Sequence, residues 1–471
     1  MLSDTLRRHL RDALGADALL ESPEALAAYA VDATPLFAGA PSAVALPAST
    51  EQVAAVVRAC AEARVAIVPR GSGTNLSGGT IPERGALVLC TARMNRIREI
   101  DAANMTADVE PGVVTAALQA AAAAQGLYYP PDPGSQRIST LGGNVAENSG
   151  GMRCLKYGVT RDYVMGLEVV LADGTVVRTG GKNVKDVAGY DLTRLFVGSE
   201  GTLGVVTRIL VRLVPAPQAR GTVLACFAGI EQAAAGAAAL IAARVVPAAL
   251  EFLDRATIEA VEAYQPSGLP TDAAAVLLIE QDGHPGQVAD DLATIERVCR
   301  EAGAFDLRTA TDPAAAEQLW AARRAALPAL ARLGPVLIME DATVPRSRLA
   351  DMVRAIDAAA RAQGLRVATF GHAGDGNLHP TCPGDARDPA LMARIDRAFE
   401  DIFAAAIELG GTITGEHGVG LAKAGYLPWR LSPETLAAMR AIKHALDPGD
   451  LFNPGKIFAA PRPRAGSATH A

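Results

Sequence analysis

Three of the seven histidines of this 471-residue chain lie in two short segments that also carry glycines and carboxylates. His372 and His379 flank Ala-Gly-Asp-Gly-Asn-Leu, and Glu416 and His417 lie in a Gly-Glu-His-Gly segment. Asp-Gly at residues 375–376 predicts a two-residue type I′ turn, which places His372 opposite His379 in a hairpin. Opposed residues share a face with Cβ atoms about 5 Å apart, so both imidazoles can bind one cation.

Glu416 can add an oxygen ligand, which leaves positions on the metal open for a substrate, as catalytic metal sites require. His417 would then lie beside the metal and could act as a base. The competing interpretation is a surface hairpin whose histidines face solvent. If only one of the two histidine-containing segments were present, this interpretation and the metal site would be equally good. The two segments together favour the metal site.

A glycine-rich loop at residues 69–79 follows a predicted strand at 65–68, which is preceded by a helix that begins with a capping box at 49–52. Such a loop lets backbone N–H groups approach a phosphate or pyrophosphate closely. It does not fit the Rossmann pattern, because Leu76 interrupts the glycines and no helix follows. It does not fit the Walker pattern either, because Gly-Gly-Thr at residues 78–80 lacks the lysine.

Three further loops, at residues 130–135, 140–151 and 198–206, consist mainly of small and hydrogen-bonding residues. A single glycine loop of this kind is commonly structural. Four of them together can enclose a long nucleotide through backbone contacts.

Charge and composition exclude several classes of protein. With 44 basic and 51 acidic residues the net charge is −7, and without a long basic run the chain lacks the electrostatic pattern of nucleic-acid binding. Leu6, Leu10 and Leu14 predict an amphipathic first helix and no signal peptide, and no apolar run reaches about 18 residues. The six cysteines are scattered, which indicates reduced, mostly buried thiols and no iron–sulfur centre in this chain. We expect a cytoplasmic protein.

These segments, in this order, resemble the FAD-linked D-2-hydroxyacid dehydrogenases, which are flavoproteins of the vanillyl-alcohol-oxidase type. The resemblance covers about residues 20–460 and is carried by the four loops, the stretch 184–207, the two histidine segments and the closing Phe-Asn-Pro-Gly-Lys at 452–456. Within the family, residues 154–158 and 339–346 are most similar to the FAD-binding subunits of bacterial glycolate oxidases. Cytochrome-linked D-lactate dehydrogenases are nearly as similar.

The resemblance implies an α+β protein with a two-subdomain FAD-binding domain of the vanillyl-alcohol-oxidase type at residues 1–214. An antiparallel-sheet cap domain with helices on one face would follow at 218–425, and residues 426–458 would return to the FAD domain. Prolines 215 and 217 fit the first boundary, because proline interrupts helices and central strands. Residues 459–471 are expected to form a disordered tail.

The resemblance also assigns the site residues. His372, His379 and Glu416 would bind a divalent metal, zinc or manganese, His417 would be the general base, and Arg323 would bind the substrate carboxylate, although Arg324 leaves the register open. FAD is expected to be noncovalent, since His9, Cys60, Cys90 and Cys154 of the FAD half lie in no attachment motif. The residues expected to contact FAD are Pro69, Arg70, Gly71, Ser72, Gly73, Thr74, Asn75, Leu76, Pro131, Asp132, Gly134, Ser135, Thr140, Gly142, Gly143, Asn144, Ala146, Asn148, Ser149, Glu200, Gly201, Gly204, Val205, Val206 and Asn453.

The implied reaction is oxidation of a small D-2-hydroxy acid, glycolate or D-lactate, to the 2-oxo acid with hydride transfer to FAD. Relatives that oxidise longer dicarboxylates carry a hydroxyl and a lysine where this chain has Leu327 and Met339, which favours a short monocarboxylate. Thr381 also replaces an asparagine that such relatives often carry. Electrons would pass to partner subunits with flavin-like and iron–sulfur elements, to a quinone or to an electron-transfer flavoprotein, and partners could bring the protein to the inner face of the membrane.

Three alternatives stay open. One is a dehydrogenase of the D-2-hydroxyglutarate or D-malate type. The others are a noncatalytic FAD-binding subunit and a redox-neutral flavoenzyme such as an ether-lipid synthase. Noncatalytic subunits lack the histidine pair and the Gly-Glu-His-Gly segment, and this chain has both, which argues for catalysis.

Overall fold

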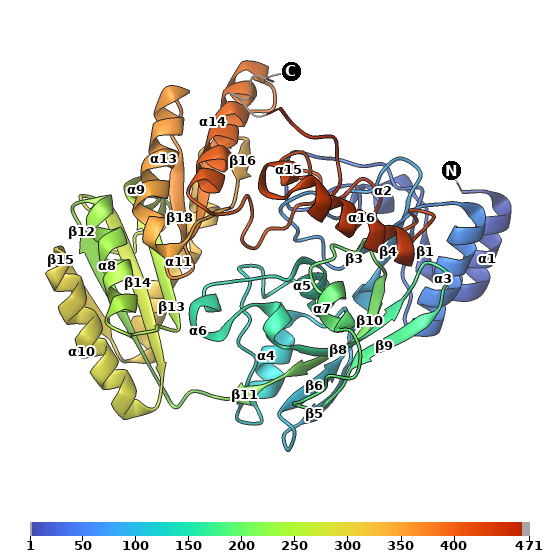
Figure 1. Ribbon diagram of the computed structural model, residues 1–471, viewed down its shortest axis with the longest axis horizontal. Coiled ribbons are helices and arrows are strands. Elements are labelled where there is room, and N and C mark those ends of the chain that lie inside the picture. The colour runs from blue at the N-terminus through green and yellow to red at the C-terminus, as the bar shows by residue number, and fades with distance from the viewer. Residues whose placement is uncertain (1, 464–471) are drawn as a thin grey trace. The chain divides into compact units, whose positions relative to one another are not determined.

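The computed structural model describes residues 2–463, and the chain forms two units (Figure 1). Unit 1 contains residues up to 150, residues 159–216 and residues 416–462. Unit 2 contains residues 151–158 and 217–415. The chain therefore leaves unit 1 twice and returns to it after each excursion.

The first part of unit 1 is a small sheet covered by helices. Helix α1 (Asp4–Leu14) buries Leu6, Leu10 and Leu14, which confirms the predicted amphipathic helix. Ser49 accepts a hydrogen bond from the N–H of Gln52 and begins α3 (Thr50–Ala63), as predicted. The strand after it starts two residues later than predicted, because Arg64 ends the helix in the left-handed conformation. The sheet order is β1 (Leu19–Leu20), β2 (Ala43–Ala45), β4 (Leu87–Cys90) and β3 (Ile67–Arg70).

The second part of unit 1 is a five-stranded antiparallel sheet. Its order is β5 (Ile97–Asp101), β6 (Thr106–Val109), β10 (Val205–Arg212), β8 (Val164–Val170) and β9 (Val176–Gly180). The remaining α-helices and strands of unit 1 are α2 (Pro23–Ala27), α4 (Thr115–Ala123), β7 (Leu127–Tyr128), α5 (Leu141–Glu147), α7 (Leu192–Phe196), β11 (Val214–Pro215), α15 (Leu427–Arg430) and α16 (Pro433–Leu446). Two small sheets with helices thus make up the FAD-binding half that the resemblance implies.

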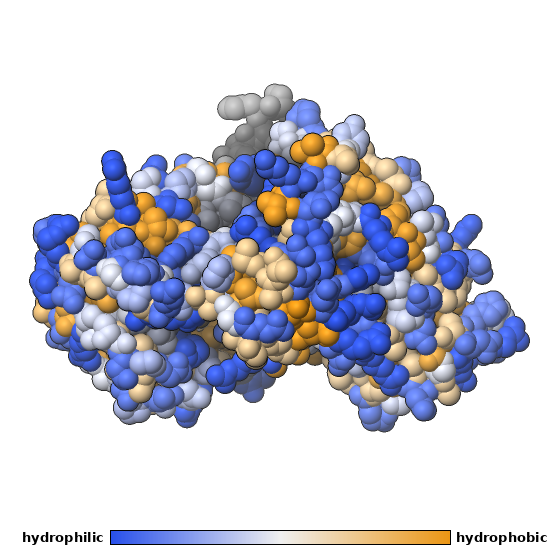
Figure 2. All heavy atoms as spheres, turned by 90° about the horizontal axis from the view of Figure 1, so that it is seen from below, coloured by the Kyte–Doolittle hydropathy of each residue, from blue (hydrophilic) through white to orange (hydrophobic). Residues whose placement is uncertain are grey.

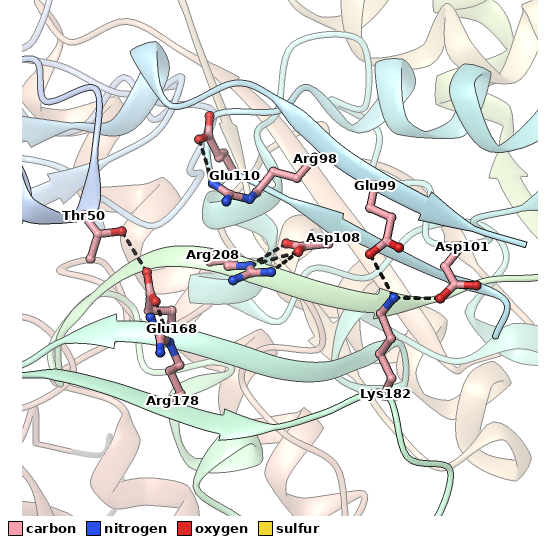
Figure 3. Close-up of polar contacts among 10 residues, drawn as sticks. All are labelled: Thr50, Arg98, Glu99, Asp101, Asp108, Glu110, Glu168, Arg178, Lys182 and Arg208. Atoms are coloured by element: carbon pink, nitrogen blue, oxygen red, sulfur yellow. Dashed lines mark hydrogen bonds and ion pairs between the residues drawn. The ribbon is translucent and has the colours of Figure 1, made fainter.

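One face of the five-stranded sheet carries ion pairs, some between neighbouring strands and one set from Lys182, just after β9, to β5 at the other edge (Figure 3). Arg208 on β10 pairs with Asp108 on β6, and Lys182 bonds to both Glu99 and Asp101, at 2.8 and 2.7 Å. Glu168 accepts from Arg178 and from Thr50, both at 2.8 Å. Because these cations are matched by carboxylates within the same face, the pairs link the strands and leave little net charge to attract an anion.

Unit 2 is built on one large antiparallel sheet. Its order is β15 (Ala304–Ala310), β12 (Ala219–Phe227), β14 (Ala275–Gly283), β13 (Ala249–Asp254), β18 (Ala368–His372), β19 (Asn377–Gly384) and β16 (Val336–Met339), with β17 (Ala342–Thr343) also paired to β19. The strands β12, β13 and β14 are almost wholly buried, which explains their continuous apolar sequences.

Helices cover both faces of this sheet, so the expectation of helices on one face is wrong. On one face, α10 (Pro285–Glu301) places Leu292 against Gly221, and α8 (Ile230–Ala242) places Gly236 against Phe227. On the other face, Trp320 of α11 (Pro313–Arg324) donates to Thr222 at 3.2 Å. Residues 221 and 222 point to opposite faces because strand side chains alternate. The other helices are α9 (Arg255–Tyr264), α12 (Ala326–Leu330), α13 (Leu349–Ala362) and α14 (Pro389–Glu408).

Unit 2 also includes residues 151–158, a short segment from the N-terminal, FAD-binding half of the sequence. Helix α6 (Cys154–Tyr157) is attached to β14 through Asp282, whose carboxylate bonds to Lys156 Nζ at 2.6 Å and to the Tyr157 hydroxyl at 2.8 Å. Leu155 packs against Gly374 in the hairpin loop. These contacts explain why residues 151–158 belong to the second unit.

The remaining global expectations concern cysteines, membranes and the tail. Five of the six cysteines are buried, and burial raises the pKa of the Cys60 thiol to about 12. Among residues 2–463 no helix is long and apolar enough to cross a membrane, and hydrophilic residues are spread over much of the face in Figure 2. Within the segment 459–471, which was predicted to be a disordered tail, the N–H of Arg462 donates to the Gly425 carbonyl at 2.9 Å. Residues 464–471 lie outside the described part of the chain.

Candidate functional site

The hairpin that carries the two histidines has a longer loop than predicted. His372 pairs with Asn377, and His379 pairs with Phe370, so residues 373–376 form a four-residue loop and the predicted two-residue turn is wrong. The N–H of Gly374 donates to the Leu250 carbonyl of β13 at 3.2 Å and cannot join the ladder to Asn377. A contact from a third strand therefore sets the register.

The two histidines nevertheless share a face of the sheet. The register differs from the prediction by two residues, and a shift of two preserves the side on which a strand residue points. His372 and His379 are 5% and 3% exposed, and their Nε2 atoms lie 3.4 Å apart. That separation exceeds the usual hydrogen-bond range of about 2.7–3.2 Å. It equals the roughly 3.4 Å between two nitrogens held about 2.0–2.1 Å from one tetrahedral zinc ion. The pair therefore fits a metal.

Glu416 is one peptide bond away from the last residue of unit 2. The preceding N–H, of Gly415, donates to Asp341 Oδ2 at 2.7 Å, and the Thr414 hydroxyl donates to the same oxygen at 2.8 Å. One ligand atom from each of His372, His379 and Glu416 lies within 4.8 Å of the others. Two imidazole nitrogens and a carboxylate oxygen suit zinc or manganese, so the donor set fits the divalent metal that the resemblance implies.

A carboxylate that the sequence interpretation missed connects His372 to Arg323. Glu251 on β13 lies directly opposite His372 in the strand register and is fully buried. Its Oε1 lies 2.6 Å from His372 Nδ1, and its Oε2 accepts from Arg323 Nε at 2.7 Å. Burial acts to raise the pKa of this carboxyl, but the adjacent His372 and Arg323 outweigh burial and lower it. The sequence did contain a signal for this residue, because Glu251 is the one acidic residue in the otherwise apolar segment 249–253.

Arg323 and its neighbour Arg324 point in different directions. Arg323 is 9% exposed, and its guanidinium lies 4.8 Å from the centre of the Phe370 ring, beside Glu251. Arg324 is exposed and pairs with Glu317 on the outer side of α11. The structure thus places Arg323, and not Arg324, next to the histidine pair.

His417 lies in unit 1 and is 8% exposed. The segment that carries it is held by Glu200, whose two carboxylate oxygens accept from the N–H groups of Val419 and Gly420 at 2.8 and 2.7 Å. At Gly418 the φ angle is +84°, and a Cβ would approach Glu147 Oε2 to 2.4 Å, so only glycine fits. Glu200, expected at the flavin, therefore also shapes the His417 segment.

The loops expected to hold FAD converge in unit 1. A Cβ on Gly71 would meet the Thr140 hydroxyl, and one on Gly201 would meet Pro69, which brings the loops at 69–79, 140–151 and 198–206 together. Asn453 Nδ2 donates to the carbonyls of Gly79 and Glu200, at 2.8 and 2.7 Å. Within residues 2–463 its buried Oδ1 has no hydrogen-bond partner, which leaves an acceptor for a ligand. The residues present therefore fit a nucleotide cofactor.

Several expected FAD residues also have structural roles in these loops. Arg70 donates to the Val31 carbonyl at 2.8 Å, and Asn75 Oδ1 accepts from the N–H groups of Ser77 and Gly79. Asn144 donates to the Thr115 hydroxyl at 2.8 Å. The loop at 131–135 is joined to α4, where Gln119 donates to the Pro131 carbonyl at 2.9 Å. These bonds hold the loop backbones in place.

Replacing Gly71 by alanine should weaken FAD binding. The added Cβ would lie 2.1 Å from the Thr140 hydroxyl, which accepts from the N–H of Gly143 at the start of α5. Overpacking of this kind costs about 1–3 kcal/mol, or roughly a 5- to 150-fold higher dissociation constant. Titration of the apoprotein with FAD measures the change. Gly181→Ala is the matched control, because a Cβ at Gly181 meets nothing within 4 Å. Equal affinities in both variants would contradict the expected packing.

Comparison with known proteins agrees with this fold. Residues 41–180 match the FAD binding domain family, and residues 216–457 match the family described as "FAD linked oxidases, C-terminal domain". The chain belongs to the FAD-linked oxidase family, and it is a flavin-dependent oxidoreductase that binds FAD.

Two relatives and one solved structure show which proteins the chain is similar to. The chain is 54% identical to the glycolate oxidase subunit GlcD of Bacillus subtilis, with 98% of each chain covered. It is 37% identical to a D-lactate dehydrogenase of Anaerostipes hadrus, over 87% of this chain and 88% of the relative. The crystal structure of p-cresol methylhydroxylase has a TM-score of 0.80 at 20% identity, with 97% of each chain covered, which shows a shared FAD-binding fold.

Proposed function

We propose that this protein oxidises a short D-2-hydroxy acid, glycolate or D-lactate, to the 2-oxo acid with the help of a divalent metal. The observation that carries the proposal is the buried histidine pair with Nε2 atoms 3.4 Å apart and the carboxylate of Glu416 within reach. The names of the relatives, a glycolate oxidase subunit and a D-lactate dehydrogenase, support the same substrate class.

In the proposed reaction the chain's own residues bind the acid and move its hydroxyl proton. Bound FAD supplies a hydride acceptor, and a bound divalent cation makes a coordinated hydroxyl more acidic. His372, His379 and Glu416 would hold the cation. His417 takes the hydroxyl proton, since an imidazole has a pKa close to neutral pH. Arg323 grips the substrate carboxylate with the N–H groups that Glu251 does not use, which fixes the orientation of the α-hydrogen.

A short substrate is supported by the apolar side chains on the same face of the sheet. Met339 lies opposite Thr381, two residues beyond His379, and packs against the cluster that contains Phe370 and Trp320. The Thr381 hydroxyl donates to the His379 carbonyl at 3.1 Å. A second carboxylate would have to be buried against these groups without a cation to pair with it, which is costly.

We propose that FAD is bound noncovalently and that electrons leave through a partner. The word subunit in the name of the GlcD relative supports partner subunits as the route, with a quinone or an electron-transfer flavoprotein as the other acceptors. Association with the inner face of the membrane would then depend on the partner. Acid precipitation should release the flavin from the protein.

The test is anaerobic reduction of the flavin by candidate substrates. The purified protein is mixed with glycolate, D-lactate, L-lactate, D-malate or D-2-hydroxyglutarate, with and without chelator, and the oxidised flavin absorbance is followed. We expect glycolate or D-lactate to bleach the flavin and a chelator to prevent it. If only D-malate or D-2-hydroxyglutarate bleached the flavin, the substrate would be a dicarboxylate and the proposed short monocarboxylate would be wrong. Bleaching by none would favour an assembly subunit or a redox-neutral enzyme.

A further inference from the structure

We propose that Glu251 is a positioning residue that holds His372 in the tautomer and orientation that leave Nε2 free to bind a metal, an inference that rests on the proposed function. Glu251 lies in the middle of β13, between the buried apolar residues Leu250 and Phe252, and has no exposed surface. A carboxylate in such a place is expensive unless both of its oxygens are bonded. Here both are, and each oxygen serves a different partner.

The hydrogen-bond chemistry determines the tautomer. An ionised carboxylate only accepts hydrogen bonds, so the 2.6 Å contact with Glu251 Oε1 requires the proton of His372 to lie on Nδ1. In a neutral imidazole the other nitrogen, Nε2, then carries the lone pair. Nε2 is the atom that lies 3.4 Å from His379 Nε2. Glu251 thus directs the lone pair of His372 toward the proposed metal.

Glu251 is itself held from the opposite side. Its Oε2 accepts from Nε of Arg323 at 2.7 Å and lies 2.7 Å from Nη2 in an ion pair. Arg323 lies in the last turn of α11, and that helix is tied to the sheet by the hydrogen bond from Trp320 to Thr222. A chain of buried contacts therefore runs from α11 through Arg323 and Glu251 to His372. Partners of this kind orient metal ligands and raise their basicity.

A purely structural role for Glu251 makes a different prediction. If the carboxylate served only to neutralise buried Arg323, replacing it would destabilise unit 2 and leave the metal affinity of the folded protein unchanged. If it positions His372, the affinity falls as well. Metal affinity and tautomer therefore separate the two roles, whereas thermal stability does not.

The first experiment compares Glu251→Gln with Asp254→Asn in the FAD-loaded protein. Asp254 is half-buried at the end of β13, but it points to the opposite face and accepts from the N–H groups of Thr257 and Thr369, both at 2.8 Å. We expect Glu251→Gln to raise the dissociation constants of Zn²⁺ and Mn²⁺ about 10- to 100-fold, and Asp254→Asn to leave them unchanged. Competition with a metal-binding dye measures both. Equal affinities in Glu251→Gln and the parent protein would overturn the proposal.

The second measurement needs no folded variant at position 251. The parent protein, labelled with ¹⁵N-histidine and loaded with Zn²⁺, should give one ring with a protonated Nδ1 and a metal-bound Nε2, which disappears in His372→Gln. A proton on Nε2 of His372 would overturn the proposal. Neither measurement involves a hydroxy acid, so a failure of the proposed substrate and a failure of the Glu251 role remain distinguishable.

Discussion

Replacing His417 by alanine should lower kcat by about 100- to 10,000-fold while FAD and metal stay bound, because a positioned general base typically contributes that much. His417 is buried in unit 1, and Glu200 holds the backbone two and three residues beyond it. Truncation of the ring removes the proton acceptor without removing those contacts. Single-turnover flavin reduction by glycolate and D-lactate, with flavin and metal analysis of the same samples, measures the effect.

The matched control for His417 is His444→Ala. His444 lies on the exposed last turn of α16, in the same unit, and its loss should leave turnover unchanged. If His417→Ala retains turnover within about tenfold of the parent, which is below the usual contribution of a general base, a different group takes the hydroxyl proton. Loss of flavin from His417→Ala would instead assign His417 a role in the structure of the FAD site.

Replacing Glu416 by glutamine should remove most of the metal and, with it, substrate-dependent flavin reduction. The change keeps the size of the side chain but removes the anionic oxygen that lies within 4.8 Å of the histidine ligand atoms. Loss of an outer partner of a ligand already costs about 10- to 100-fold in metal affinity, and loss of a ligand should cost at least as much. Metal analysis after dialysis against a defined free Mn²⁺ or Zn²⁺ concentration provides the measurement.

Glu62→Gln is the corresponding control, since Glu62 is an exposed residue near the end of α3 and makes the same change of charge. Its metal content should equal that of the parent protein. An unchanged metal content in Glu416→Gln would remove Glu416 from the ligand set. Metal-free Glu416→Gln that still oxidised the acid at the parent rate would argue against metal assistance altogether.

Several helices and loops of this protein could be predicted from local sequence patterns, because such patterns involve residues that are close together in the chain. The period of α1, the serine cap of α3 and the position of the glycine loops follow from residues a few positions apart. The shared face of His372 and His379 was also predictable, even with the wrong register, because the two-residue period of a strand is insensitive to a shift of two. The sequence could not decide, by contrast, whether Arg323 or Arg324 faces the histidine pair. That choice depends on how α11 packs on its sheet.

The sequence by itself therefore determined the family, the glycine-rich loops and the shared face of His372 and His379, because each depends on short contiguous segments. Tertiary structure decided the hairpin register, through the bond from Gly374 to Leu250, and the coverage of the large sheet on both faces. It also decided the partner of His372, because Glu251 is 121 residues from His372 in the chain and 72 residues from Arg323. A buried carboxylate in an apolar strand signals that a partner exists, but only strand pairing and helix packing bring that partner within hydrogen-bond distance.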